Sequence, residues 1–215
     1  VRGCDAFVIQ SHSAPLNDKI MEQLIMVDAL KRASAKRITV VVPHYGYARQ
    51  DSKAEGREPI TAKLIANLFK TAGAKRLVSV DLHSGQIQGF FDGPVDHLTA
   101  MPVLVEWMQT NLGNEDLVVV SPDAGRVKVS ERYANALHAN IAMVHKSRTK
   151  GKKNTVEAKD VVGDVNGKVC VLIDDMIDTG GTLVAAAELL AERGATKVYA
   201  AATHGVFSGP AIERI

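Results

Sequence analysis

The sequence predicts an α/β fold in which mostly parallel sheets are covered by helices on both faces. Runs of aliphatic and β-branched residues, among them 38–42 and 169–173, alternate with segments in which apolar residues recur at helical spacing. Strands that are apolar along their whole length are typical of parallel sheets buried on both faces. The 215 residues, 46% hydrophobic and 23% charged, suffice for one large domain or two small ones.

The expected elements follow one another in a regular order. Strands are expected where aliphatic and β-branched residues cluster, at 6–9, 38–42, 77–80, 117–120, 141–144, 169–173 and 198–201. Helices are expected to begin near residues 17, 61, 103, 127 and 182. Asn17 and Thr61 have side chains suited to capping helix starts, and Gly73 is suited to ending a helix.

The strand–helix pattern occurs twice, which predicts two domains, residues 1–100 and 101–215. The expected boundary is a loop rich in glycine and proline that gives way to a new helix. The chain opens on Val1 and closes on Ile215, where a further helix is expected to begin after Pro210. We therefore expect an internal part of a longer protein, lacking both termini.

In parallel α/β sheets, ligands bind at the carboxyl ends of the strands. The segments that follow each expected strand are therefore the candidate site.

Charge, hydropathy and cysteine content argue against several classes of protein. No run approaches 18 consecutive apolar residues, so no membrane-spanning helix is expected. The net charge of +2 is too small to indicate a nucleic-acid partner. Cys4 and Cys170 lie in or beside apolar runs, which favours buried free thiols over a disulfide or a nucleophile. Free thiols, and no signal segment at the start, indicate a reducing cytoplasm.

The segment after the strand at 169–173 carries the strongest chemical signal. It reads DDMIDTGGT from Asp174 to Thr182 and leads into a helix. Glycines allow close backbone approach, and the amides and dipole at a helix N-terminus favour an anion such as phosphate. The paired carboxylates Asp174 and Asp175 could accept hydrogen bonds from sugar hydroxyls or hold a hydrated cation. No Gly-Lys-Ser/Thr follows, so this is not a Walker A loop.

A second polar segment follows the strand at 77–80 and reads DLHSGQIQGFFDGPVD. Asp81 and His83 come directly after the strand, and Asp92 and Asp96 are expected to return toward them from the following loop. Such a cluster could bind Mg²⁺ through carboxylate oxygens and water. Because a neutral imidazole is a poor Mg²⁺ ligand, His83 could instead contact a metal-bound water or a phosphate.

Together, these segments resemble the ribose-phosphate pyrophosphokinase family. The run VLIDDMIDTGGT, residues 171–182, is similar to the phosphoribosyl diphosphate motif that this family shares with phosphoribosyltransferases. The run at 81–96 resembles a signature of the pyrophosphokinases that the transferases lack. The resemblance extends over essentially the whole chain, and it implies two phosphoribosyltransferase-like domains.

The resemblance implies a role for each set of residues. The ribose 5-phosphate would be held by Asp174, Asp175, Asp178, Thr179, Gly180, Gly181 and Thr182. The loop PHYGYARQD would contact ATP through Arg49, Gln50 and Asp51. The turn SPDAG would place Asp123 at a second Mg²⁺ position. With the acidic segment described above, the implied metal set is Asp81, His83, Asp92, Asp96 and Asp123.

Residues 146–153 form a basic segment, KSRTKGKK, with five positive charges and no acid. Composition alone fits a solvated loop or a nucleic-acid patch. The family has a flexible catalytic loop at this place, and the resemblance implies that Lys146 and Arg148 are its catalytic residues, with Arg148 also contacting ribose 5-phosphate. Diphosphoryl transfer spreads negative charge over the β-phosphoryl oxygens, which such side chains stabilise.

The implied activity is transfer of the diphosphoryl group of ATP to ribose 5-phosphate, with Mg²⁺ as cofactor, for nucleotide biosynthesis. A non-catalytic regulatory subunit of such an enzyme stays open as an alternative, as does a phosphoribosyltransferase. The resemblance also implies a homo-oligomer, commonly a hexamer built from dimers. Phosphate and ADP are the implied effectors, and neither nucleic acid nor membrane is an expected partner.

Some positions depart from the family pattern. Ser52 and Glu55 stand at loop positions that are usually basic, and Ser147 replaces a frequent basic residue. Arg126 stands where a glycine is common, directly after SPDAG. The stretch 150–159 matches the family's loop poorly. None of these departures removes a residue with an implied catalytic role.

Overall fold

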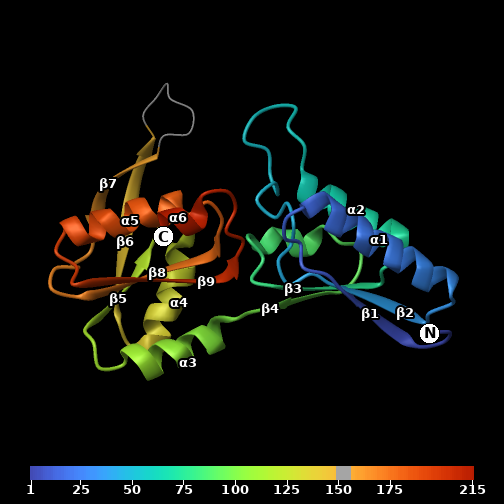
Figure 1. Ribbon diagram of the computed structural model, residues 1–215, viewed down its shortest axis with the longest axis horizontal. Helices are drawn as coiled ribbons and strands as arrows, with labels where there is room; N and C mark the ends of the chain where they lie inside the picture. The colour runs from blue at the N-terminus through green and yellow to red at the C-terminus, as the bar shows by residue number, and fades with distance from the viewer. Residues whose placement is uncertain (149–155) are drawn as a thin grey trace. The chain divides into compact units, whose positions relative to one another are not determined.

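The structure, a computed structural model, describes the backbone of residues 1–148 and 156–215 and the side chains of residues 1–145 and 160–215. It divides into two compact units, Val1–Thr99 and Ala100–Ile215, each taken by itself below (Figure 1). Both units combine parallel strands with helices, so the predicted α/β class is confirmed. Among the described residues, no helix has the length and apolar character that crossing a membrane requires.

The first unit is a four-stranded parallel sheet. Its strands β1 (Asp5–Ile9), β2 (Arg37–Val41), β3 (Arg76–Val80) and β4 (Val95–Leu98) lie in that spatial order. Helices α1 (Leu16–Arg32) and α2 (Thr61–Ala72) lie side by side on one face, where they share a core with Val8, Val40 and Leu77 of the sheet (Figure 1). A short helix, η1 (Gly85–Gly89), follows β3.

The opposite face of this sheet carries exposed apolar side chains. Phe7 and Ile9 flank the buried Val8 along β1 and are 65% and 68% exposed. Because successive side chains of a strand point to opposite faces, these two lie on the face away from the helices. The predicted covering of both faces is therefore not found in the described part of the first unit.

The second unit is a five-stranded sheet with helices on both faces, as predicted. Strands β5 (Leu117–Ser121), β6 (Asn140–Arg148), β7 (Val156–Val162), β8 (Val169–Ile177) and β9 (Lys197–Gly205) lie in the order β7-β6-β5-β8-β9. The pair β6–β7 is antiparallel, and the other pairs are parallel.

The two cores of the second unit share the central strands. Helices α3 (Met101–Leu112) and α4 (Val127–Leu137) pack with Val171 and Ile173 of β8. Helix α5 (Gly181–Glu192) packs with Cys170 and Leu172 of the same strand. A short helix, α6 (Ala211–Arg214), follows β9. Strand β8 is thus buried on both faces up to the point where its acidic residues begin.

Two strands, β4 and β7, are absent from the sequence prediction. Strand β4 has only four residues, half of them polar, so its pattern does not separate it from a loop. Strand β8 also runs four residues past its predicted end at 173, because Asp174 to Ile177 continue the ladder with β9. The predicted acidic loop therefore begins inside a strand.

The helix starts also differ from prediction. Helix α1 has Pro15 as its N-cap, and Asn17 instead accepts a hydrogen bond from the Tyr47 hydroxyl (2.6 Å), so the predicted Asn17 cap is wrong. Thr61 is the first residue of α2 rather than its cap. Gly73 ends α2 with a φ of 132°, as predicted, in a conformation that few other residues adopt.

The two cysteines differ in burial. Cys170 is fully buried on β8, and burial raises the pKa of its thiol to about 11. Cys4 precedes β1 and is exposed. The predicted burial is confirmed for Cys170 and wrong for Cys4.

Candidate functional site

In the first unit, the loop between β2 and α2 is held at both ends. The hydroxyl of buried Tyr45 donates to the carbonyl of Ala62 at the start of α2 (2.9 Å), and burial raises the pKa of Tyr45, so the phenol stays a donor. The amide of Ala62 donates to the carbonyl of Gln50 (3.2 Å). Arg49 and Gln50 are exposed on the loop so formed, where a ligand can reach them.

A buried histidine supports the same loop. The amide of Gly46 donates to Nδ1 of His12 (3.0 Å), and Nε2 of His12 lies 3.0 Å from Oε1 of Gln23. Because Nδ1 accepts, Nε2 carries the proton and donates to Gln23. Gln23 in turn donates to the carbonyl of Val8 (2.9 Å), and the imidazole lies nearly parallel to the Phe69 ring. This network links β1, α1 and α2 to the loop, and it requires a neutral imidazole.

Acid should therefore weaken the first unit. Burial lowers the pKa of His12 below 6.5, although the hydrogen bond with Gln23 works against this. The unfolded chain takes up a proton on this histidine near pH 6.5, whereas the folded protein takes it up only at a lower pH. The free energy of unfolding therefore decreases as the pH falls below 6.5 toward the pKa of His12 in the folded protein. We expect the free energy of unfolding of His12→Gln, whose amide can both accept and donate, to fall less between about pH 7.5 and about pH 5.5 than that of the unchanged protein.

Urea unfolding followed by circular dichroism measures this difference. His145→Gln, at an exposed position on β6, is the matched control and should keep the pH dependence of the unchanged protein. Equal pH dependence in His12→Gln and the unchanged protein would show that His12 is not the group responsible.

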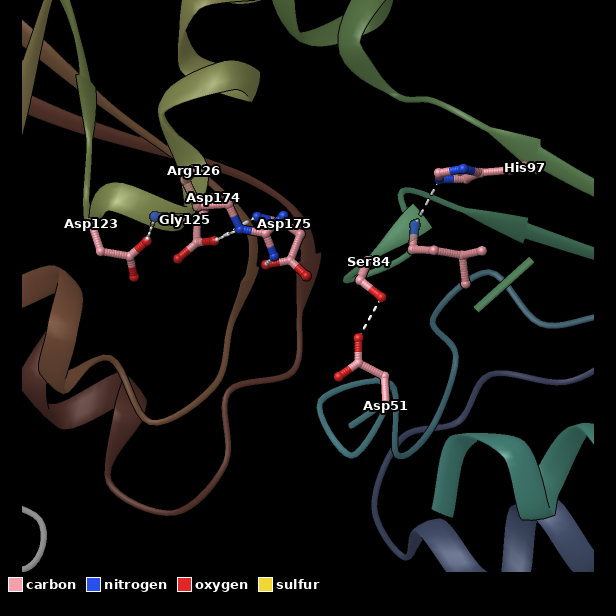
Figure 2. Close-up of polar contacts among 9 residues, drawn as sticks. Asp51, Ser84, His97, Asp123, Gly125, Arg126, Asp174 and Asp175 are labelled. Carbon is pink, nitrogen blue, oxygen red and sulfur yellow. Dashed lines mark hydrogen bonds and ion pairs between the residues drawn. The ribbon is translucent and has the colours of Figure 1, made fainter. Parts of the chain in front are cut away.

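Asp51 joins this loop to the loop after β3 (Figure 2). Its carboxylate accepts hydrogen bonds from the hydroxyl of Ser84, from Nε2 of Gln86 (2.9 Å) and from the hydroxyl of Ser52 (3.1 Å). Burial works to raise the pKa of Asp51, but these hydrogen bonds and the nearby His83 together hold it below its usual range. The ionised carboxylate thus binds protein groups from both loops.

The segment after β3 is shaped by the unpredicted strand β4. The amide of Leu82 donates to Nε2 of His97 (2.9 Å; Figure 2), and the amide of Asp81 donates to the carbonyl of Leu98 (2.9 Å). Asp81 has a φ of 42°, an uncommon conformation for a residue other than glycine. His97 therefore positions the turn that carries His83, and sequence reasoning missed it although it directly follows the acidic run.

The predicted metal cluster is not assembled within the first unit. Asp96 lies on β4 and pairs with Arg76 of β3 (Nη1–Oδ2, 2.7 Å). Asp92 is 91% exposed and pairs with Lys70 of α2 (3.7 Å). The residues that the structure describes contain no group of three or more His, Cys, Asp or Glu side chains able to hold a metal ion. Asp96 is opposite Val78 of β3, two residues before the end of that strand, and Asp92 and Asp96 pair with Lys70 and Arg76 instead of gathering with Asp81 and His83.

In the second unit, Asp123 caps the turn after β5. Its Oδ1 accepts the amide of Gly125 (3.0 Å; Figure 2), and its carbonyl accepts the hydroxyl of buried Ser121 (2.6 Å). These bonds fix the short helix η2 (Ala124–Arg126), whose last residue reaches the neighbouring strand β8.

Arg126 bridges the two acids of β8 (Figure 2). Its Nη2 lies 2.5 Å from Oδ1 of Asp175, and its Nε lies 3.2 Å from Oδ1 of Asp174. The side chain of Asp175 is only 6% exposed, so the guanidinium offsets the cost of burying its charge. Burial and the hydrogen bond with Asp175 raise the pKa of Asp174 to about 7, although the Asp175 amide (2.8 Å) and Arg126 work to lower it.

The predicted sugar-phosphate loop connects β8 to α5. Gly180 is the N-cap of α5 and has a φ of 73°. The amide of Ser208 donates to the carbonyl of Asp178 (3.0 Å), and Nη1 of Arg214 donates to the carbonyl of Thr179 (3.2 Å). Since the first turn of a helix leaves its amides without partners inside the helix, the start of α5 is suited to a phosphate.

The two predicted catalytic residues, Lys146 and Arg148, have described backbones only. Both lie in β6, and Lys146 is opposite Ala158 of β7, directly after a shift in register. The basic segment predicted as a loop from residue 146 is therefore a strand as far as Arg148. The side chains of both residues, and residues 149–155, lie outside the described residues.

The second unit is thus an α/β sheet in which a strand carries two acids near its carboxyl end and leads through a glycine-containing loop to a helix start, an arrangement suited to phosphorylated ligands. Two family models match the chain. Residues 1–73 match the N-terminal domain of ribose phosphate pyrophosphokinase, and residues 155–215 match the phosphoribosyl synthetase-associated domain.

Whole-chain comparisons agree with these matches. The sequence is 62% identical over 214 residues to ribose-phosphate pyrophosphokinase from Streptomyces avermitilis and 59% identical over 216 residues to that from Mycobacterium tuberculosis. Each of these matches covers 100% of this chain and 66% of the relative, so the chain spans just under two thirds of the relatives' length. The crystal structure of phosphoribosylpyrophosphate synthetase from Mycobacterium smegmatis, 60% identical, matches with a TM-score of 0.92 over 100% of this chain and 69% of that chain. The chain belongs to the ribose-phosphate pyrophosphokinase family.

Proposed function

We propose that the protein transfers the diphosphoryl group of ATP to the anomeric hydroxyl of ribose 5-phosphate. The anomeric oxygen attacks the β-phosphorus, and the bond from that phosphorus to the oxygen bridging the α-phosphorus breaks. AMP leaves with the bridging oxygen, the hydroxyl proton is released, and 5-phosphoribosyl 1-diphosphate is formed. The observation that carries the proposal is the acidic pair and glycine loop at the end of β8, in a chain 62% identical to a ribose-phosphate pyrophosphokinase.

The end of β8 would hold the pentose phosphate. The loop from Asp178 to Thr182 would receive the 5-phosphate at the start of α5, where amides and the helix dipole favour an anion. The side chain of Asp174 is 26% exposed and can accept from the ribose hydroxyls. Asp175 is too buried to be the main sugar contact, and it would act by orienting its neighbour.

The first unit would hold the nucleotide. Arg49 and Gln50 are exposed on the loop after β2, where a guanidinium suits the phosphates of ATP. Asp51 was predicted as an ATP contact, but its carboxylate is engaged by Ser84 and Gln86. Its proposed role is to hold the nucleotide loop against the loop after β3.

Magnesium enters this proposal with the nucleotide, as Mg-ATP. The described parts of the chain lack a cluster of three metal-binding side chains, so they do not fit an ion held by the protein alone. His83 and Asp123 are single groups of the kind that contact water on a hydrated cation. Lys146 and Arg148 would stabilise the charge that develops on the transferred group. Homo-oligomer formation, response to phosphate or ADP, and a cytoplasmic location belong to the same proposal.

The test uses a full-length protein that contains this sequence. Mg-ATP is supplied with and without ribose 5-phosphate, and the products are followed by ³¹P NMR. We expect AMP and an anomeric diphosphate to form only when both substrates are present. Binding of both ligands without turnover would favour a regulatory subunit, and consumption of phosphoribosyl diphosphate with a nucleobase would favour a phosphoribosyltransferase.

A further inference from the structure

We propose that Arg126 is a positioning residue for the pentose: it fixes the Asp174–Asp175 pair so that Asp174 presents an acceptor to the ribose hydroxyls. The inference rests on the function proposed above and deepens it. Arg126 acts through the two acids and is not assigned a contact with substrate. It would thereby set the enzyme's discrimination between pentose phosphates that have and lack those hydroxyls.

The geometry of the bridge supports this role. The guanidinium is planar and reaches both acids at once, with Nη2 at 2.5 Å from Asp175 and Nε at 3.2 Å from Asp174. The side chain of Arg126 is only 14% exposed, so water screens these contacts little. Strands β5 and β8 are paired neighbours, with Val120 opposite Leu172, so the turn that carries Arg126 is anchored beside the acids that it holds.

Charge decides what the pair can bind. Two neighbouring carboxylates alone would attract a divalent cation. A guanidinium between them cancels one negative charge and occupies an oxygen of each acid. No third acidic or histidine ligand completes a metal site among the described residues. Of the two ligands that the sequence left open for this pair, Arg126 favours the sugar hydroxyl over the hydrated cation.

The experiment compares ribose 5-phosphate with 2-deoxyribose 5-phosphate in the full-length protein, Arg126→Gln and Arg126→Lys. In Arg126→Gln we expect the KM for ribose 5-phosphate to rise at least about tenfold, with kcat and the KM for ATP within about threefold. Discrimination between the two pentoses should fall about tenfold, because the acceptor for the missing hydroxyl is no longer held. Arg126→Lys keeps the charge but not the planar bridge, and it should recover part of the discrimination.

Controls separate this role from a general loss of structure. Arg193→Gln removes an exposed ion pair of the same unit, Arg193–Asp160 at 3.3 Å, and should change none of these values. The effects of Arg126→Gln and Asp175→Asn should be less than additive, since Arg126 acts through that acid. If Arg126→Gln does not fold, the same comparison is made with Arg126→Lys.

Unchanged discrimination between the two pentoses in a folded Arg126 variant would overturn the inference. So would an equal loss for both pentoses, because that result describes damage to the site as a whole. Calorimetric binding of the two pentose phosphates gives the same comparison without turnover. Failure of the unchanged protein to form AMP would therefore overturn the proposed function, while the binding ratios would still decide the role of Arg126.

Discussion

Replacing Gly180 by valine should lower kcat/KM for ribose 5-phosphate by at least about 10²-fold. Gly180 has a φ of 73°, in the left-handed region that β-branched residues avoid, and a Cβ there would lie 3.3 Å from Ile215. The left-handed backbone conformation and the close contact with Ile215 both disfavour a branched side chain here, so we expect the loop to shift and to displace the proposed phosphate site at the start of α5. A displacement of about 1 Å at a reacting site can cost about 10²-fold in rate. Steady-state kinetics with varied ribose 5-phosphate measure the effect.

Gly167 offers a matched control for this substitution. It lies in the same unit with a φ of 74°, and a Cβ there meets nothing within 4 Å. Gly167→Val therefore introduces a similar backbone strain, about 1–2 kcal/mol, without moving the loop after β8. We expect it to lower the unfolding temperature and leave the KM for ribose 5-phosphate unchanged. An unchanged KM in Gly180→Val as well would mean that the loop after β8 does not bind the pentose phosphate.

Lys146→Ala should reduce kcat by at least about 10²-fold and leave the fold intact. Lys146 lies in β6 three residues after Met143, which is opposite Ser121 of β5. Its backbone is therefore at the same edge of the sheet as Asp123, where the strands of the second unit present their carboxyl ends. A group that stabilises charge only in the transition state lowers kcat when it is removed, with little change in KM.

The rate of AMP formation at saturating substrates tests this prediction. Lys128→Ala removes an exposed lysine of the same unit, on α4, and should keep full activity. Circular dichroism of both variants confirms that they are folded. Full turnover in Lys146→Ala would refute the catalytic role of this residue.

The sequence identifies the strands in which aliphatic and β-branched residues dominate and misses β4 and β7, which are richer in polar residues. Positions 169–173 are apolar throughout because both faces of β8 are covered, and this pattern has few other interpretations. Strand β4 pairs with β3 through backbone hydrogen bonds, yet its four residues VDHL have no apolar face long enough to be distinctive. The extension of β8 beyond Ile173 is equally hidden, since its first two residues are acids that a ligand-binding loop could also carry.

The candidate site follows the same division. The run from Asp174 to Thr182 could be predicted because one continuous segment carries both the acids and the glycines. Arg126 could be singled out as unusual, but its bridge to the acids depends on which strands are neighbours, and that is a property of the sheet. The placement of Asp96 likewise depends on which strands are neighbours, because the sequence spacing gives no sign that Asp96 pairs with Arg76.

The unequal burial of the two thiols gives each unit its own chemical reporter. Cys4 is exposed beside β1, so a maleimide fluorophore can be attached there without disturbing a core. Cys170 is enclosed on β8 with a thiol pKa of about 11, and a thiol reagent reaches it only when the second unit opens. The rate at which Cys170 is modified under native conditions therefore measures how often the second unit, which carries the proposed pentose site, opens. A ligand that binds there would slow that modification, and the label at Cys4 would show at the same time whether the first unit responds.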